Sequence, residues 1–189
     1  MIGVEALRRI GASCALGVVA AFATGALGAV LIIRGAEYCG GIPLGNVPLQ
    51  QAWTIDNASA IVEAWHRGRC ECKAANQVWL DYLFILAYAS LLFFIGLTGE
   101  RAAARRGMSR LAFVAGLSAC GGLLAGLFDC LENVGLLVMI LHGPMPVVPF
   151  LTSVCSSLKF MLTSFSAIVG LIVLAAVLIH WSRQRRAHA

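Results

Sequence analysis

LAFVAGLSACGGLLAGLFDCLENVGLLVMIL, residues 111–141, is an apolar run long enough to cross a bilayer as one helix, for which about 20 residues suffice. Two acids and an amide interrupt it: Asp129, Glu132 and Asn133. They stand at positions i, i+3 and i+4, so they share one helix face. A charged side chain near the bilayer centre costs roughly 2.5–3.5 kcal/mol on insertion scales. The cluster is therefore a candidate functional site.

The composition places the whole chain in a membrane. Of its 189 residues, 60% are hydrophobic and 12% are charged, whereas about a quarter of a soluble domain is charged. We predict an all-α polytopic membrane protein, a four-transmembrane-helix antiparallel bundle with a short outer-side helical cap, in one domain over residues 1–189. The predicted spans are 10–33, 77–98, 111–141 and 150–180; the predicted outer segments are 34–76 and 142–149, and the cytoplasmic ones are 99–110 and 181–189.

Basic residues indicate the orientation of the spans. Arg8 and Arg9 precede the first span, and further arginines fill residues 101–110 and 183–186. By the positive-inside rule, we expect both termini to be cytoplasmic in a multi-pass protein of the plasma (inner) membrane of a bacterium. The first apolar run exceeds the 7–15 residues of a signal-peptide core, so we expect it to be retained, with a cleaved signal as the alternative. The net charge of +5 thus indicates contact with membrane lipids rather than with nucleic acid.

The first outer segment, 34–76, is the only large connection between spans. It begins with a Gly/Pro-rich stretch at 40–48 that is typical of an irregular loop. A short helix should follow, with Asp56 or Asn57 as its N-cap and Gly68 as its end. Its apolar face would consist of Ile61, Val62 and Trp65. We expect three tryptophans to lie at the headgroup interface, Trp53, Trp65 and Trp79.

A lysine in the fourth span is the expected partner of the acidic cluster. Counted from the outer ends of their spans, Asn133 lies eight residues in and Lys159 nine, which is about 12 Å and about 13–14 Å at 1.5 Å per residue. We therefore predict an ion pair of Lys159 with Asp129 or Glu132. Without a partner, each buried charge would be costly or would be neutralised.

Other polar residues extend this cluster into a predicted polar-lined recess, open toward the outer leaflet. The full predicted ligand site consists of Asp81, Tyr88, Asp129, Glu132, Asn133, Lys159, Thr163 and Ser166. In this hypothesis Asp129 and Glu132 bind the charge of a ligand, and Lys159 is their internal counter-ion, displaced or deprotonated on binding. Asp81 would guard the mouth, and the remaining residues would supply hydrogen bonds.

The leading functional hypothesis is binding or transport of a lipid-like, amine or cationic ligand. A second hypothesis is an accessory or structural subunit of a larger membrane complex, in which the polar cluster fixes helix register. A third is a lipid-modifying enzyme with Asp129 or Glu132 as general base. No motif identifies catalytic residues, a metal site or a cofactor.

A row of small residues in the first span predicts close helix packing. The row consists of Gly17, Ala21, Gly25 and Ala29. Rows of this kind let membrane helices approach each other closely. We favour packing within the bundle, and contact with a homo-oligomer or a partner membrane subunit is the alternative.

The seven cysteines fall into two groups. Cys39 with Cys70 or Cys72 could form a disulfide on the oxidising outer side, which leaves one thiol over. The span cysteines are expected to be small apolar fillers: Cys14, Cys120, Cys130 and Cys155. The topology is similar to that of four-span, quinone-linked thiol oxidases. Those proteins carry a Cys-x-x-Cys pair and a second cysteine pair, which this chain lacks, so a thiol-redox protein is a less favoured alternative.

Overall fold

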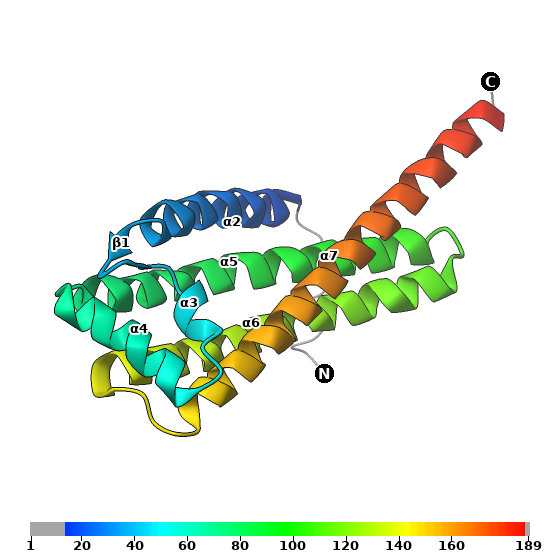
Figure 1. Ribbon diagram of the computed structural model, residues 1–189. Helices are drawn as coiled ribbons and strands as arrows, with labels where there is room; N and C mark the ends of the chain where they lie inside the picture. Colours follow the sequence, from blue (N-terminus) through cyan, green and yellow to red (C-terminus); the bar gives the residue numbers. More distant parts are fainter. Residues whose placement is uncertain (1–13, 188–189) are drawn as a thin grey trace, which may run out of the picture.

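The computed structural model describes residues 14–187 and consists mainly of four long helices (Figure 1). These are α2 (Cys14–Gly35), α5 (Glu71–Ala104), α6 (Ser109–His142) and α7 (Val148–Ala187). Between α2 and α5 lie a hairpin of β1 (Tyr38–Cys39) and β2 (Ile42–Pro43) and the short helices α3 (Val47–Gln50) and α4 (Ile55–Arg67). Arg8, Arg9 and the start of the first predicted span lie outside the described residues.

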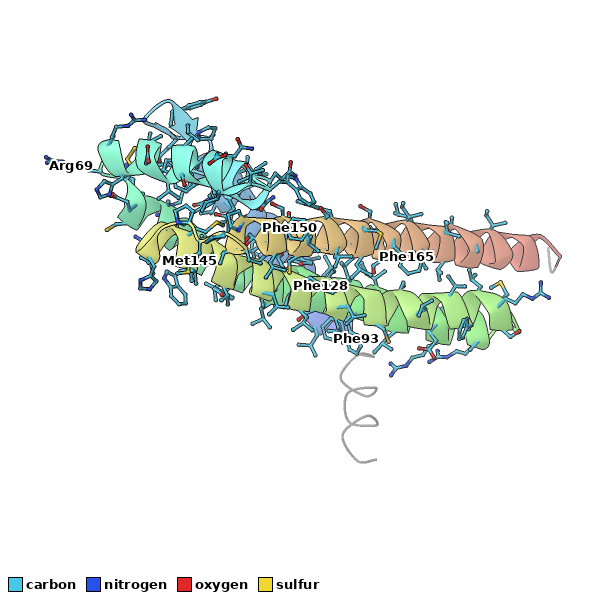
Figure 2. All side chains as sticks on the ribbon, turned by 60° about the horizontal axis from the view of Figure 1, so that its bottom comes forward. Arg69, Phe93, Phe128, Met145, Phe150 and Phe165 are labelled. Carbon is cyan, nitrogen blue, oxygen red and sulfur yellow. A yellow bond between two sulfur atoms is a disulfide. The ribbon has the colours of Figure 1, made fainter. Side chains whose placement is uncertain are left out.

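Each long helix contains a segment that is long and apolar enough to cross a membrane. These segments are Leu16–Gly35, Glu71–Ala104, Ser109–His142 and Val148–Ala176. Large apolar side chains project from the helix surfaces, and Figure 2 shows Phe150 and Phe165 among them; their exposed fractions are 51% and 38%. Such a surface suits lipid, so the chain has the features of a multi-pass membrane protein.

The second long helix extends beyond its predicted span at both ends. The prediction of 77–98 followed hydropathy, whereas α5 runs from Glu71 to Ala104. Backbone hydrogen bonding, which sets the true helix ends, continues through the polar residues that flank the apolar run.

Glycines allow the helices to come close together at the centre of the fold. A Cβ at Gly96 would lie 2.7 Å from Ala119 of α6, and one at Gly122 would lie 2.7 Å from Leu92 of α5. These separations are closer than real Cβ contacts, so only glycine fits there without a shift of the backbone. The α5–α6 pair is thus held by close approach of small residues, as is common in membranes.

The first long helix, α2, packs mainly against α5 and makes little contact with α6 or α7. Two of its glycines come close to α5: a Cβ at Gly28 would lie 3.3 Å from Phe84, and one at Gly35 would lie 3.4 Å from Gln77. A Cβ at Gly17 or Gly25 would meet nothing within 4 Å, and Ala21 is exposed. The expectation that the small-residue row packs within the bundle is therefore wrong. The row faces outward because α2 turns its other side to α5.

The hairpin, α3 and α4 cover one end of the long helices, and we call these elements the cap (Figure 1). A continuous core joins the cap to α5 and α6, in which Trp65 (2% exposed) and Leu49 (0%) meet Val78, Leu136 and Met139. The placement of Trp65 at the headgroup interface is wrong, because its ring fills this core. Trp53 and Trp79 are 45% and 58% exposed.

The predicted helix in the cap exists, with one difference at its start. Helix α4 is capped by Thr54, whose hydroxyl accepts a hydrogen bond from the Asn57 amide at 3.3 Å, so the prediction of Asp56 or Asn57 as N-cap is wrong. Gly68 ends the helix as predicted. Threonine is also a preferred N-cap, although it ranks below aspartate and asparagine.

A disulfide fastens the cap to the start of α5. It joins Cys39 of β1 to Cys70, one of the two predicted pairings, and Cys72 remains an exposed free thiol. Of the span cysteines with described side chains, Cys130 and Cys155 are half-buried. Cys120 is exposed on the surface of α6, so its prediction as a packing filler is wrong.

Candidate functional site

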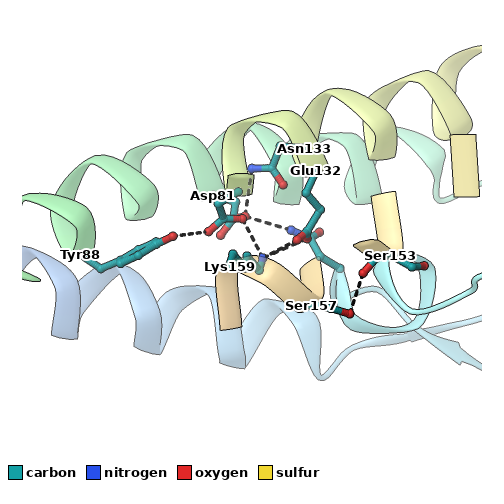
Figure 3. A network of polar contacts seen from close by, with 9 residues as sticks. Asp81, Tyr88, Glu132, Asn133, Ser153, Ser157 and Lys159 are labelled. Carbon is teal, nitrogen blue, oxygen red and sulfur yellow. Dashed lines mark hydrogen bonds and ion pairs between the residues drawn. The ribbon is translucent and has the colours of Figure 1, made fainter. Parts of the chain in front are cut away.

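The intramembrane polar residues meet in one network at the junction of α5, α6 and α7 (Figure 3). At its centre the ammonium of Lys159 donates to Asp129 Oδ1 at 2.7 Å and to Glu132 Oε1 at 2.9 Å. Its nitrogen also lies 2.9 Å from Glu132 Oε2. The predicted ion pair is therefore present and involves both acids. The side chains are 10% (Lys159), 4% (Asp129) and 0% (Glu132) exposed, so the triad is deeply buried.

The second oxygen of Asp129 is also occupied. The hydroxyl of Tyr88, on α5, donates to Asp129 Oδ2 at 2.8 Å. Both oxygens of this carboxylate therefore accept short hydrogen bonds, one from a cation and one from a phenol. Such an arrangement holds the carboxylate in place and stabilises its charge.

Asp81, one helix away, is held by amides rather than by a cation. Asn133 Nδ2 donates to Asp81 Oδ2 at 3.0 Å, and Asn46 Nδ2 from the cap donates to the same oxygen at 3.4 Å. Among the described residues, no hydrogen bond reaches Asp81 Oδ1. Asp81 is nevertheless buried, since the residue is only 8% exposed.

The network is short of positive charge and of hydrogen-bond donors. Three carboxyl groups face one ammonium, so the formal charge is −3 + 1 = −2 when all are ionised. Within the described chain, the buried oxygen Asn133 Oδ1 lacks a partner, and Glu132 Oε2 accepts no hydrogen bond although it lies 2.9 Å from the Lys159 nitrogen. Buried polar atoms normally find partners, and unpartnered ones occur where a proton, a water or a ligand belongs.

A cavity of about 830 Å³ adjoins the network. It lies between α2, α5 and α7 beneath the cap, and polar side chains of the network contribute to its wall. The remaining wall is largely apolar and includes Leu31, Ile32, Phe84, Leu91, Leu92 and Phe160. The expectation of a polar-lined recess is thus wrong in part, because most polar groups are turned toward one another and leave apolar side chains to face the space.

The predicted site residues occupy three different positions. Five of them line the cavity: Asp81, Tyr88, Asp129, Lys159 and Thr163. Glu132 and Asn133 are fully buried behind that wall, at 0% exposure. Ser166 lies apart from the cluster, where its hydroxyl donates to the Ser118 carbonyl at 2.9 Å and thereby links α7 to α6.

Several polar residues of the cavity wall were not predicted from the sequence. Asn46 and Gln50 come from the cap, Thr24 from α2, and Gln77 from the head of α5. Gln77 could have been noticed as a polar residue beside an apolar run, and it donates to the Leu31 carbonyl at 2.7 Å. Asn46 and Gln50 could not be singled out in the same way, because polar residues are expected throughout a connecting segment whether or not they line a cavity.

No family model, curated protein or solved structure matches this chain. The geometry of the cavity and of the network therefore carries the functional argument alone.

Proposed function

We propose that this protein binds, and through binding transports, an amphipathic molecule with a cationic or hydrogen-bonding head. The single observation that carries this proposal is the junction of an apolar cavity of about 830 Å³ with a buried network of three carboxyl groups and one lysine. Ligand sites in proteins are mostly apolar clefts of about 300–1,000 Å³ with a few convergent polar groups. Intramembrane ionisable residues commonly mark such sites.

In our proposal the cavity opens toward the outer leaflet of the plasma membrane. The arginine-rich link 101–110 and the end of α7 lie away from the cap (Figure 1). If these basic segments are cytoplasmic, the helices form an antiparallel bundle with both termini inside and the cap outside. A disulfide in the cap supports this orientation, since disulfides persist on the oxidising side of a membrane.

The network would hold the head of the ligand. Asp129 and Lys159 form a fixed polar floor on the cavity wall, and Tyr88 and Thr163 add hydroxyl groups beside it. Glu132 acts from behind by holding the Lys159 ammonium in place. Transport would follow when the ligand changes leaflet or leaves for an acceptor.

Native mass spectrometry of the full-length protein tests this proposal. Wild type would be compared with Asp129→Asn/Glu132→Gln and with a matched control, Asp56→Asn/Glu63→Gln, whose acids lie exposed on α4. We expect a lipid or amphiphile to co-purify with wild type and control but not with the site variant. An empty wild type, or equal retention in all three proteins, contradicts the proposal.

A second function, an accessory subunit of a larger complex, is favoured by one feature. The outward row of α2 offers a close-packing surface that the described bundle leaves open at Gly17, Ala21 and Gly25. This hypothesis expects purification in a stoichiometric complex that Gly25→Leu disrupts. A monodisperse single chain after mild solubilisation contradicts it.

A further inference from the structure

Asp81 is the carboxylate that remains available to a ligand. Both oxygens of Asp129 already accept hydrogen bonds, from Lys159 and Tyr88. Glu132 is fully buried and contacts Lys159. Asp81, by contrast, lies in the cavity wall, and from the described residues its Oδ1 receives no hydrogen bond. The head of a ligand should therefore contact Asp81 directly, while Asp129 and Lys159 form the polar floor beside it.

The surroundings of Asp81 favour a positively charged donor. Its contacts are the neutral amides of Asn133 and Asn46, so no cation balances it directly. A buried carboxylate without a counter-charge costs several kcal/mol. A protonated amine supplies both the charge and an N–H group for Oδ1, whereas a hydroxyl supplies the hydrogen bond alone. An anionic head would add to a cluster that is already formally negative.

The apolar wall fits one alkyl chain. A methylene group occupies about 30 Å³, close to the share of one water molecule in the liquid. A chain of about 16 carbons therefore needs about 480 Å³, which leaves room for a small head within about 830 Å³. Two such chains need about 960 Å³ and exceed it.

The cavity has a side opening between α2 and α7. Ile32 of α2 and Phe160 of α7 line it and are nevertheless 74% and 48% exposed, so they stand at its rim. Helix α2 is held mainly by α5 and makes little contact with α7, which leaves this side uncovered. The other end is covered by the cap residues Asn46, Pro48 and Gln50. A ligand thus reaches the site from the acyl-chain region of the bilayer.

Resting on the proposed function, we infer that the occupant is a single-chain amphiphile with a protonated amine head. The amine lies against Asp81 Oδ1, and the chain lies along Leu31, Phe84 and Leu91 toward the opening between α2 and α7.

Saturable binding of radiolabelled hexadecylamine to the full-length protein in phosphatidylcholine nanodiscs tests this inference. Hexadecanol and hexadecyl sulfate serve as competitors of equal chain length. The head variant is Asp81→Asn, which keeps an acceptor for Asn133, and its control is Asp56→Asn on exposed α4. The variant for the alkyl chain is Leu31→Trp, which places a larger ring in the cavity, and its control is Ile33→Trp on the exposed side of α2.

We expect one amine per protein and an affinity about tenfold or more above that of the alcohol, since hydrogen bonds to charged groups are the stronger ones. Asp81→Asn should lower amine affinity by a similar factor, and Leu31→Trp should weaken binding because its ring narrows the space for the alkyl chain, while both controls bind as wild type. The variant for the alkyl chain keeps the polar network intact, so it remains informative if Asp81→Asn fails to fold.

Three results would overturn the inference. If hexadecanol binds as tightly as the amine, or if folded Asp81→Asn binds the amine as wild type does, the head assignment is wrong while the apolar cavity remains a binding site. If no hexadecyl compound binds saturably, the single-chain ligand is wrong. In that last case the native mass spectrometry described above decides whether the proposed function also fails, because co-purification detects a ligand of any class.

Discussion

Replacing Lys159 by methionine should destabilise the protein strongly. Methionine keeps much of the length of the side chain but removes the ammonium that both Asp129 and Glu132 contact, at 2.7 and 2.9 Å. Two buried carboxylates would then lie close together without a counter-charge. They would have to repel each other, take up protons or draw water into the bundle.

The magnitude follows from burial. Because the three side chains are 10% exposed or less, loss of one partner should cost about 3–5 kcal/mol. The matched control is Lys73→Met, whose ion pair with Glu37 spans 3.4 Å between side chains that are 67% and 55% exposed. Such a surface pair contributes about 0–1 kcal/mol.

Thermal unfolding of the purified protein in one detergent measures the difference. At about 2–4 °C per kcal/mol, Lys159→Met should lower Tm by about 6–20 °C, and Lys73→Met by about 4 °C at most. The triple variant Lys159→Met/Asp129→Asn/Glu132→Gln should recover part of the loss, because its amides need no counter-charge. Acidification should also shrink the deficit of Lys159→Met, since protonated carboxyls carry no charge.

Two results would refute this reasoning. If Lys159→Met unfolds at the same temperature as Lys73→Met, the buried triad does not stabilise the fold. If the triple variant is no more stable than Lys159→Met, the loss comes from packing and not from charge.

Three further predictions concern the cap, the helix contacts and the ligand. Cys39→Ser should remove the disulfide and lower stability by about 3–4 kcal/mol, whereas Cys72→Ser should not change Tm, and intact mass before and after reduction verifies the bond. Gly126→Leu should disrupt the α5–α6 contact, because even a Cβ there would lie 2.9 Å from Ala89, while Gly25→Leu on open space should leave the unfolding temperature of the isolated chain near that of wild type. Amine binding in nanodiscs should weaken as pH falls from about 8 to about 4, because a protonated Asp81 no longer offers a charge to the amine, and a constant affinity over that range would contradict an ionic head contact.

Part of the candidate site was predictable because helix geometry is simple. Spacing along α6 placed Asp129 and Glu132 on one face, and counting residues from the span ends placed Lys159 at their depth. The cap contact was not predictable. Asn46 lies 35 residues before Asp81 in an irregular segment, and nothing local indicates that it returns to that carboxylate.

The sequence by itself determined the four apolar helices, because length and hydropathy suffice to specify a membrane span. It also determined the pairing of Lys159 with the acids of α6, because a charge inside a bilayer needs an opposite charge at a similar depth. Only the tertiary structure decided which side of α2 faces α5, since an almost uniformly apolar helix carries no pattern to orient it. That choice turns the small-residue row outward and leaves the space between α2 and α7 in which the cavity forms. The tertiary structure also decided that Asp81, rather than Asp129, presents to the cavity an oxygen without a partner among the described residues. Which carboxylate oxygens accept hydrogen bonds depends on neighbours from several helices at once.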